Sequence, residues 1–462
     1  MFTTETYTNR RLRLKKLVQN GIVLLPGNTE AAMNYPANTY HFRQDSAFLY
    51  YFGLDHPDLA GVVDLDAGED IIFGNDVDMD DIIWMGPQPS MAERAAKVGV
   101  MQTKPLGELE GFVKQALAAG RKVHFLPPYR GETKMWLSDL LGIKTCFLKS
   151  YVSQELIKAV VAMREIKEAC EIAEIDAMVD VAYEMHTTAM RMAKVGIVEK
   201  QIAGRMEGIA LELGAGVSFP IILTINGQTL HNHYHGNVLR EGRMLISDAG
   251  AESDLRYCSD ITRSTPVGGK FSQRQKEIYE VCLEANVKGI GAIKPGVFYR
   301  DIHWLAAETI AKGLKDLGLM KGDVKEAVQQ GAHALFFPHG LGHHMGMDVH
   351  DLESLGENNV GYDHEISRSN QFGLAFLRMA RRLIPGQVLT VEPGIYFIPA
   401  LIDQWKAENK FSEFINYERV EDYRDFGGIR IEDDVLVTEA GFRVMGKPIP
   451  KTVAEVEAMA AS

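Results

Sequence analysis

Five side chains of the kinds that bind hard metal ions stand in the C-terminal half of the chain. They are Asp248 and Asp260 in DAGAESDLRYCSDITRS, His343 in HGLGHHMGMDVHD, Glu392 in LTVEPGIYF and Glu432 in GGIRIEDDVLVTE. Four carboxylates are more than one divalent ion requires, which favours a two-metal centre. Two such ions, typically about 3.5–4 Å apart, activate a water molecule and polarise a carbonyl or phosphoryl oxygen. The sequence therefore predicts a hydrolase.

The alternation of side chains along a strand explains the sequence pattern around these ligands. In GIRIEDDVLV, side chains at every second position share a face, which groups Arg430, Glu432 and Asp434. Such a polar face between isoleucines and valines is expected to line a metal-filled cleft. Asp248 and Gly250 share a face in the same way, and we expect the missing side chain at Gly250 to let an ion or substrate approach the backbone.

Histidines gather in two groups that could act on substrate. The groups are His231, His233 and His235 in TLHNHYHGN, and His333, His339, His343, His344 and His350 around the glycine-rich ligand frame. A hydrolase of this kind needs imidazoles to orient substrate and stabilise the charge that develops on its carbonyl oxygen. We expect one or two members of each group to do so, and the others to be structural.

Length and composition indicate the number of domains, the excluded partners and the compartment of the protein. The chain has 462 residues, 46% hydrophobic and 24% charged, which predicts two globular domains. Its net charge of −13, without a basic stripe, argues against nucleic acid or an anionic membrane as a partner. The four cysteines form no CxxC pair, and neither a signal peptide nor a membrane-spanning stretch is evident. These features predict a cytoplasmic protein.

The elements that must position the ligands fall into two α/β regions. Residues 1–158 are predicted to begin with a helix around Arg10–Val18, followed by strands at GIVLL, FLYYFGL, GVVDLD and IIF and a helix through MAERAAKVG. A long helical segment, 153–192, carries the chain into a second domain, 159–462. There, helices beginning near Ser272 and Asp301 alternate with strands, so we expect a core sheet with helices packed outside it.

At the ligand frames the chain resembles the metal-dependent Xaa-Pro peptidases with the pita-bread fold, namely aminopeptidase P and prolidase. The resemblance extends to YTNRRLRLKKL, GIVLLPGN and FRQDSAFLYYFGL in the N-terminal region, so it covers nearly the whole chain. It implies a small N-terminal α/β domain of the aminopeptidase P type, followed by a pita-bread catalytic domain. It also implies peptide substrates with proline in second position and a homodimeric enzyme.

The resemblance further implies the ligand set and the catalytic residues. Two divalent ions, Mn(II) first and Co, Fe or Zn as alternatives, would share a hydroxide that attacks the scissile carbonyl. The roles that it implies are these: Asp248 binds one ion, His343 and Glu392 bind the other, and Asp260 and Glu432 bridge both. His231 and His350 would hold the substrate or its tetrahedral intermediate, while His339 and Arg430 support the ligands and Glu392 helps to move a proton.

Several frames are closer to prolidase than to aminopeptidase P. FLRMARRLIPGQVLTVEPGIYFI and the long interval between Glu392 and Glu432 are of the prolidase type. Arg378 matches an arginine that would bind the C-terminal carboxylate of the substrate, because a guanidinium pairs bidentately with a carboxylate. That role favours dipeptides over the longer peptides cleaved by aminopeptidase P. The alternative for Arg378 is a surface arginine beside Arg381 and Arg382.

The chain departs from the family pattern at three places. The Asp248–Asp260 interval is one residue longer than usual, and the extra residue is expected in a hairpin around 252–256. His344 stands where relatives carry an aromatic residue, which predicts a more polar pocket. TLHNHYHGN offers both His231 and His233 as the substrate histidine, and the spacing to Asp248 favours His231.

Two other classes of function compete with an Xaa-Pro peptidase. One is a non-catalytic pita-bread binding module, although such proteins normally lack the ligands that are present here. The other is a two-metal hydrolase with a different substrate, such as a phosphoesterase, although no phosphate-binding loop is found.

Overall fold

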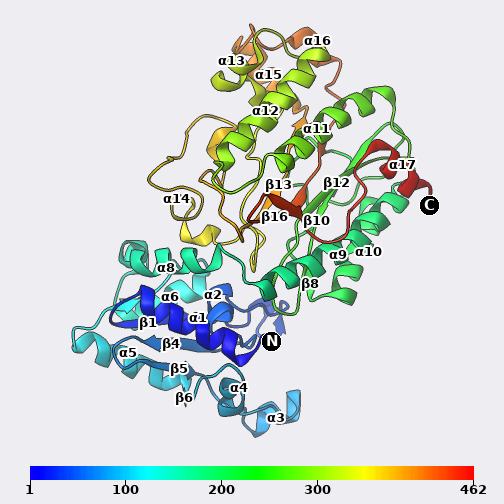
Figure 1. Cartoon of the computed structure of the whole chain (residues 1–462). Helices are drawn as coiled ribbons and strands as arrows, with labels where there is room; N and C mark the ends of the chain where they lie inside the picture. Colours follow the sequence, from blue (N-terminus) through cyan, green and yellow to red (C-terminus); the bar gives the residue numbers. More distant parts are fainter. The chain divides into compact units, whose positions relative to one another are not determined.

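The computed structural model describes all 462 residues, which divide into two units (Figure 1). Unit 1 comprises residues 1–164 with 354–359, and unit 2 comprises residues 165–353 with 360–462. The domain boundary at residue 158 stays a prediction. No helix in the structure combines the length and the apolar character needed to cross a bilayer.

Unit 1 is built on a five-stranded sheet in the order β6-β5-β4-β1-β7. Its strands are β1 (Ile22–Pro26), β4 (Ala60–Asp64), β5 (Glu69–Phe73), β6 (Gln102–Lys104) and β7 (Val123–His124), with a separate hairpin of β2 (Ala32–Tyr35) and β3 (Asn38–Thr39). The helices are α1 (Thr4–Leu17), α2 (Ser46–Phe52), α3 (Met79–Met85), α4 (Met91–Lys97), α5 (Leu109–Ala118), α6 (Gly131–Leu141), α7 (Leu148–Tyr151) and α8 (Gln154–Arg164). Strand β1 pairs antiparallel with β4 and parallel with β7, which gives the sheet its mixed character.

One expected strand of unit 1 is a helix. The segment FLYYFGL forms most of α2, which begins after Asp45, whose side chain accepts a hydrogen bond from the Phe48 amide. The helix ends at Gly53, which has a φ of 62° in the left-handed region. All seven residues of α2 are buried. Because no polar face interrupts the apolar run, its period could not distinguish a helix from a strand.

Unit 2 contains the strands that carry the predicted ligands. They are β8 (Gly216–Val217), β9 (Ile222–Thr224), β10 (Met244–Ala249), β11 (Ala251–Glu252), β12 (Ile261–Pro266), β13 (Val388–Val391), β14 (Gly394–Tyr396), β15 (Gly428–Arg430), β16 (Asp433–Val437) and β17 (Phe442–Val444). They form three-stranded sheets β12-β10-β9 and β13-β16-β17 and pairs β14-β15 and β11-β8. A bridge between Thr262 and Glu432 connects the first of these sheets to the segment between β15 and β16.

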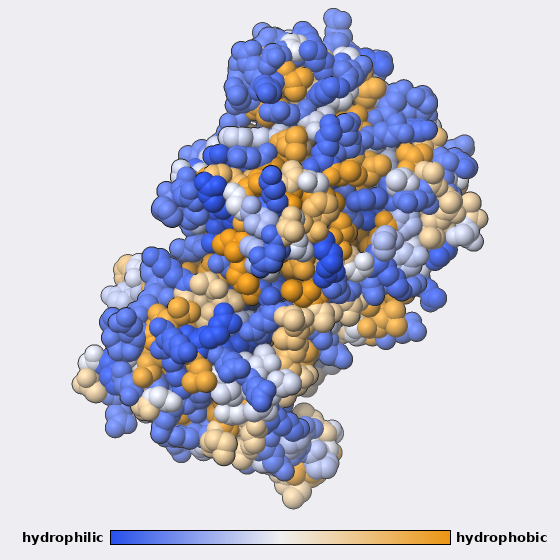
Figure 2. Space-filling model, in the orientation of Figure 1, coloured by the Kyte–Doolittle hydropathy of each residue, from blue (hydrophilic) through white to orange (hydrophobic).

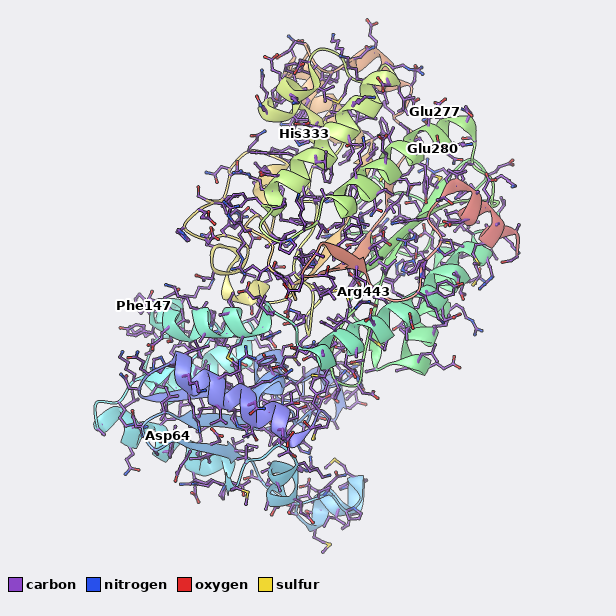
Figure 3. All side chains as sticks on the ribbon, in the orientation of Figure 1. Asp64, Phe147, Glu277, Glu280, His333 and Arg443 are labelled. Carbon is purple, nitrogen blue, oxygen red and sulfur yellow. The ribbon has the colours of Figure 1, made fainter.

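Helices pack outside these sheets, as expected. They are α9 (Ala169–Met192), α10 (Glu199–Leu213), α11 (Gln273–Gly291), α12 (Tyr299–Asp316), α13 (Val324–Gln330), α15 (Pro399–Ala407), α16 (Tyr417–Glu421) and α17 (Val453–Ala461), and α14 (Glu357–Val360) lies where the two units share the chain. Met185 of α9 and Met206 of α10 belong to one buried apolar cluster with Leu245 of β10. Arg443 of β17 donates two hydrogen bonds of 2.8 Å to Asp176 of α9 (Figure 3). The helical segment expected over 153–192 consists of two helices, α8 and α9.

Apolar side chains also reach the surface. On the face drawn in Figure 2, apolar patches alternate with charged and polar residues. Helix α3 is the most exposed short helix of unit 1, with Met79, Ile83 and Trp84 all more than two-thirds exposed. The acidic stretch before it is a helix start, since Asp78 caps α3 by accepting from the Asp81 amide.

Candidate metal centre and active site

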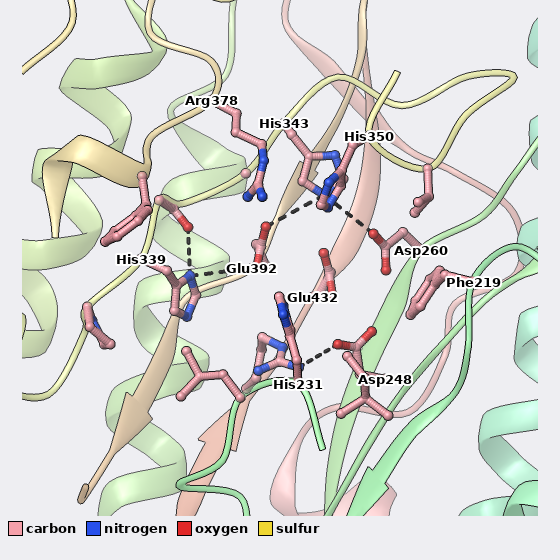
Figure 4. Close-up of a pocket in the computed structure, with 18 of the residues that line it drawn as sticks. Phe219, His231, Asp248, Asp260, His339, His343, His350, Arg378, Glu392 and Glu432 are labelled. Carbon is pink, nitrogen blue, oxygen red and sulfur yellow. Dashed lines mark hydrogen bonds and ion pairs between the residues drawn. The ribbon is translucent and has the colours of Figure 1, made fainter. Parts of the chain in front are cut away.

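One cavity of about 550 Å³ in unit 2 gathers all five predicted metal ligands (Figure 4). Its wall also contains the predicted substrate and support residues His231, His233, His339, His350, Arg378 and Arg430. Apolar side chains, among them Phe219, Ile222 and Phe372, complete the wall. A hollow with an apolar lining and a few convergent polar groups is the usual form of a small-molecule site.

The hairpin of β10 and β12 positions the two aspartates. Asp248 lies in β10 directly opposite Thr262, and Asp260 stands immediately before β12. Between the two aspartates the chain turns near Arg256, which adopts a left-handed φ of 67°. The position of the extra residue in this hairpin stays a prediction. Strands β10 and β12 pair in a regular register, and both carboxylates reach the cavity.

Gly250 serves this hairpin and not the cavity. A Cβ atom at Gly250 would lie 1.7 Å from the backbone oxygen of Ser259 and 2.6 Å from Ser218 Oγ. The expectation that an ion or substrate approaches the backbone here is wrong, because the returning strand of the hairpin occupies that space.

We expect Gly250→Ala to lower the free energy of unfolding by about 3 kcal/mol or more, since the backbone must move to relieve the overlap. Chemical denaturation measures the change. The control is Gly204→Ala in α10, where no atom lies within 4 Å of the new Cβ. That change should stabilise the protein by about 0.5–1 kcal/mol, because alanine is the better helix former. Equal effects of the two substitutions would contradict the assignment.

His343 presents one ring nitrogen to the carboxylates. Its Nδ1 donates to the backbone oxygen of His344 at 3.0 Å, which leaves Nε2 without a proton in the neutral ring. Nε2 lies 3.4 Å from Asp260 Oδ2 and 3.7 Å from Glu392 Oε1. Ligand atoms of Asp260, His343 and Glu432 all lie within 4.8 Å of one another. This arrangement is suited to a shared cation.

Glu392 and Glu432 each stand in a short gap between two strands. Glu392 separates β13 from β14, and Glu432 separates β15 from β16. Glu392 lies outside the strand ladders, and Glu432 pairs through its bridge to Thr262. The flanking strands hold both backbones while the side chains turn into the cavity. The Glu392 amide donates to Leu341 and the Glu432 amide to Thr262, both to backbone oxygens.

Arg430 links the ligands through a buried hydrogen-bond network. Its Nη2 donates to Asp248 Oδ2, its Nε to Thr262 Oγ1 at 3.1 Å and its Nη1 to the Tyr396 hydroxyl at 2.7 Å. The Thr262 hydroxyl in turn donates to Glu432 Oε2 at 2.6 Å. Thr262 and Tyr396 were not predicted from the sequence, since neither residue type signals such a role.

Three successive acids near β16 have three different partners. Glu432 turns to the cavity, Asp433 pairs with Arg263 at 2.6 Å and with Lys451 at 2.7 Å, and Asp434 accepts from the Asp260 amide at 2.9 Å. Burial alone would raise the pKa of Asp433, but the two cations hold that pKa below its ordinary value. The predicted strand alternation is thus observed, although Asp434 supports the backbone behind the cavity.

The donor set fits divalent cations. Asp248 Oδ1 is buried and accepts no hydrogen bond, so it is available to a cation. Burial, followed by the charge of Asp248, raises the pKa of Asp260 to about 8. Burial also raises the pKa of Glu392 to about 8, and that of Glu432 well above its ordinary value. Carboxyl groups in this setting need additional positive charge to ionise at neutral pH, and hard divalent ions supply it.

We expect metal binding to release protons below pH 8. In the metal-free fold Asp260 and Glu392 keep their protons up to about pH 8, whereas a metal ion requires their carboxylates. Mn(II) affinity should therefore rise with pH, by about tenfold per unit for each proton displaced. Isothermal titration calorimetry at pH 6.5 in two buffers of different ionisation enthalpy measures the release. Identical heats in both buffers would contradict it.

The histidines divide as expected into cavity and structural groups. His231, His233, His339, His343 and His350 line the cavity, whereas His235, His333 and His344 do not. His333 is buried without a partner for either ring nitrogen (Figure 3), and burial lowers its pKa to about 4. His344 is also buried behind the wall, so the expectation of a more polar pocket at this position is wrong.

His231 and His350 lie on opposite sides of the carboxylates (Figure 4). Burial and then Arg430 lower the pKa of His231, and Asp248 and His350 also act on it, so it lies among the charged groups of the site. His339 contacts the Tyr396 hydroxyl through Nε2 at 3.0 Å and the Gly340 oxygen through Nδ1 at 2.8 Å. Both nitrogens of His339 are therefore engaged in supporting contacts.

Arg378 differs from its two neighbouring arginines. Arg381 pairs with Glu165, and Arg382 pairs with Glu365 at 2.9 Å. Arg378 lines the cavity, and its guanidinium group points toward Glu392 (Figure 4).

Comparison with known proteins identifies the family. Residues 173–439 match the model of metallopeptidase family M24, and residues 7–125 match the aminopeptidase P N-terminal domain. The chain belongs to metallopeptidase family M24. This M24 chain is 34% identical to human Xaa-Pro dipeptidase, over 97% of its length and 90% of the relative's. It is 31% identical to a probable Xaa-Pro aminopeptidase of Uncinocarpus reesii, over 95% of its own length and 89% of the relative's.

Solved structures agree with this assignment. A variant of Escherichia coli aminopeptidase P in complex with substrate superposes with a TM-score of 0.82 at 28% identity, covering 100% of this chain and 98% of that one. The predicted architecture, an N-terminal α/β domain followed by the pita-bread domain of M24 enzymes, is confirmed. The prediction that the chain is a metallopeptidase is also confirmed. The individual ligand and substrate roles stay predictions.

Proposed function

We propose that this M24 chain is a two-metal exopeptidase that hydrolyses the bond between an N-terminal residue and proline. The principal support is one cavity that joins all five metal-type ligands with the Arg378 guanidinium group. The names of the relatives, Xaa-Pro dipeptidase and Xaa-Pro aminopeptidase, are consistent with this substrate class.

The five ligands would hold two divalent ions, as the family resemblance implies. Asp248 would bind one, His343 and Glu392 the other, and Asp260 and Glu432 would bind both. Mn(II) is our proposal for the ion, because carboxylate oxygens with one imidazole suit it, while Co, Fe and Zn are admitted by the same donors. When bound, the ions supply an activated water and polarise the scissile carbonyl.

The chain's own residues bind and orient the peptide. Arg378 offers its guanidinium group to the C-terminal carboxylate of a dipeptide, a charge-assisted pairing with bidentate geometry. The apolar wall around Phe219 and Phe372 suits the proline ring, whose fixed φ favours a preformed pocket. A longer peptide would need its next residue to pass Arg378, so this residue favours dipeptides.

His231 and His350, on either side of the carboxylates, would donate hydrogen bonds to the carbonyl oxygen as it gains negative charge. Glu392 would accept a proton from the attacking water and return it to the leaving nitrogen. His339 and Arg430 would hold these groups in position.

We also propose a cytoplasmic homodimer. The four cysteines are all free thiols, which agrees with a reducing compartment. Analytical ultracentrifugation tests the oligomeric state.

The decisive experiment compares Ala-Pro with Ala-Pro-Ala on chelator-treated protein reloaded with Mn(II). Turnover of the dipeptide alone is the expected result and would establish a dipeptidase. Turnover of the tripeptide at a comparable or higher rate would make the enzyme an aminopeptidase. No turnover of either, with Mn(II) bound, would favour a two-metal hydrolase of another substrate or a binding module.

A further inference from the structure

A carboxylate outside the cavity wall lies between two of the proposed substrate residues. Glu353 Oε2 is 2.6 Å from His350 Nδ1 and 3.2 Å from Arg378 Nε. Both partners line the cavity, but Glu353 does not. One carboxylate oxygen is therefore shared by the imidazole and the guanidinium group.

The contact with His350 fixes the role of its two nitrogens. Because Nδ1 donates to Glu353, Nε2 is the nitrogen left for the substrate. Nε2 donates to the charged carbonyl oxygen when the ring is an imidazolium, the form that the Glu353 carboxylate stabilises. The ring of His350 also packs against His343 with centroids 4.2 Å apart, so it has little freedom to turn. The hydrogen bond from His350 is the main reason that the pKa of Glu353 is lowered to about 2, so this carboxylate stays ionised at neutral pH.

The contact with Arg378 engages the inner edge of the guanidinium group. Nε lies close to Glu353, but the angle of its N–H is poor for a hydrogen bond, so the contact is an ion pair rather than a directed bond. No protein group accepts a hydrogen bond from Nη1 or Nη2. These two donors point into the cavity (Figure 4), where a carboxylate could bind both.

We propose that Glu353 is a positioning residue that links the group binding the substrate carboxylate to the group stabilising the reaction. It acts through Arg378 on dipeptide binding and through His350 on the chemical step. This inference rests on the proposed function, and it adds a specificity determinant that does not touch the substrate.

The test uses Glu353→Gln, which keeps the shape of the side chain and removes its charge. The enzyme is loaded with Mn(II) and assayed on Ala-Pro and on Ala-Pro amide, which lacks the carboxylate. We expect KM for Ala-Pro to rise about tenfold, in line with the loss of an interaction with a charged group. KM for the amide should stay unchanged, while kcat should fall for both substrates.

Two further variants separate positioning from folding. Glu353→Asp keeps the charge and should restore part of the lost KM effect, whereas Glu353→Ala should match Glu353→Gln. Glu365→Gln is the matched control, since Glu365 pairs with Arg382 at 2.9 Å outside the cavity. A purely structural role would lower the melting temperature and affect both substrates alike, and that result would overturn the proposal.

The outcomes also separate this inference from the proposed function. If the parent cleaves Ala-Pro and Glu353→Gln has parental KM and kcat, the positioning role is wrong while the function stands. If the parent cleaves neither substrate, the function fails. Calorimetric binding of Ala-Pro then decides the role of Glu353: weaker binding by Glu353→Gln supports it, and equal affinity overturns it.

Discussion

Asp260→Asn lowers kcat/KM for Ala-Pro by about a thousandfold or more, because loss of one shared ligand removes several kcal/mol of transition-state stabilisation. Asp260 belongs to the group of ligand atoms within 4.8 Å of one another, so no neighbouring acid can replace it without moving. Steady-state kinetics with Mn(II) measures the effect. Asp254→Asn, at an exposed position in the same hairpin, is the control and should keep parental activity.

The same substitution should stabilise the metal-free protein. The pKa of Asp260 in the fold is raised to about 8, so the folded state binds more protons than the unfolded chain between about pH 4 and 8. Stability of the metal-free parent therefore falls as pH rises through that range. At pH 8.5 the metal-free variant should melt at a higher temperature than the metal-free parent, and it should gain less from added Mn(II). A variant that melts lower would contradict the charge repulsion inferred for this site.

Arg378→Ala raises KM for Ala-Pro by about a hundredfold, since the charge-assisted pairing with the substrate carboxylate is lost. Hydrolysis of Ala-Pro amide should change little, because that substrate makes no such pairing. Initial rates of the Mn(II)-loaded enzyme over a range of concentrations of each substrate give KM and kcat for both.

Arg382→Ala provides the control for Arg378→Ala, since it removes a neighbouring arginine that pairs with Glu365 instead of lining the cavity. If Arg378→Ala hydrolysed Ala-Pro as well as the parent does, Arg378 would be a surface arginine and the preference for dipeptides would lose its basis.

The convergence of the five proposed ligands on one cavity could be anticipated in part from local sequence. Alternation along a strand groups Arg430 with Glu432, and antiparallel pairing brings Asp248 and Asp260 to one end of a hairpin. By contrast, α2 was predicted as a strand because its residues are buried on every side, so no amphipathic period was available.

Glu353 and Gly250 needed the structure. The partner of Glu353, Arg378, is distant in sequence, and no periodicity links them. Gly250 was assigned to ligand access because the sequence gives the missing side chain but not the neighbour that fills its space, which is the Ser259 backbone. Contacts of this kind depend on where loops place residues that are apart in the sequence, and local sequence patterns do not contain that information.

The three successive acids at residues 432–434 also bear on the strand register of this segment and on its tolerance of insertions and deletions. A slip of one residue in pairing would turn Asp433 to the cavity and Glu432 toward Arg263, because each shift reverses the faces of a strand. Each face would still present a carboxylate, but the one in the cavity would be a methylene shorter than Glu432 and the one beside Arg263 and Lys451 a methylene longer than Asp433. The charges of the misaligned form would therefore balance, and the error would lie in the reach of the side chains and in the exchanged faces of the buried neighbours Ile431 and Val435. Insertions and deletions here should be far less tolerated than in the surface loops, whatever their effect on catalysis.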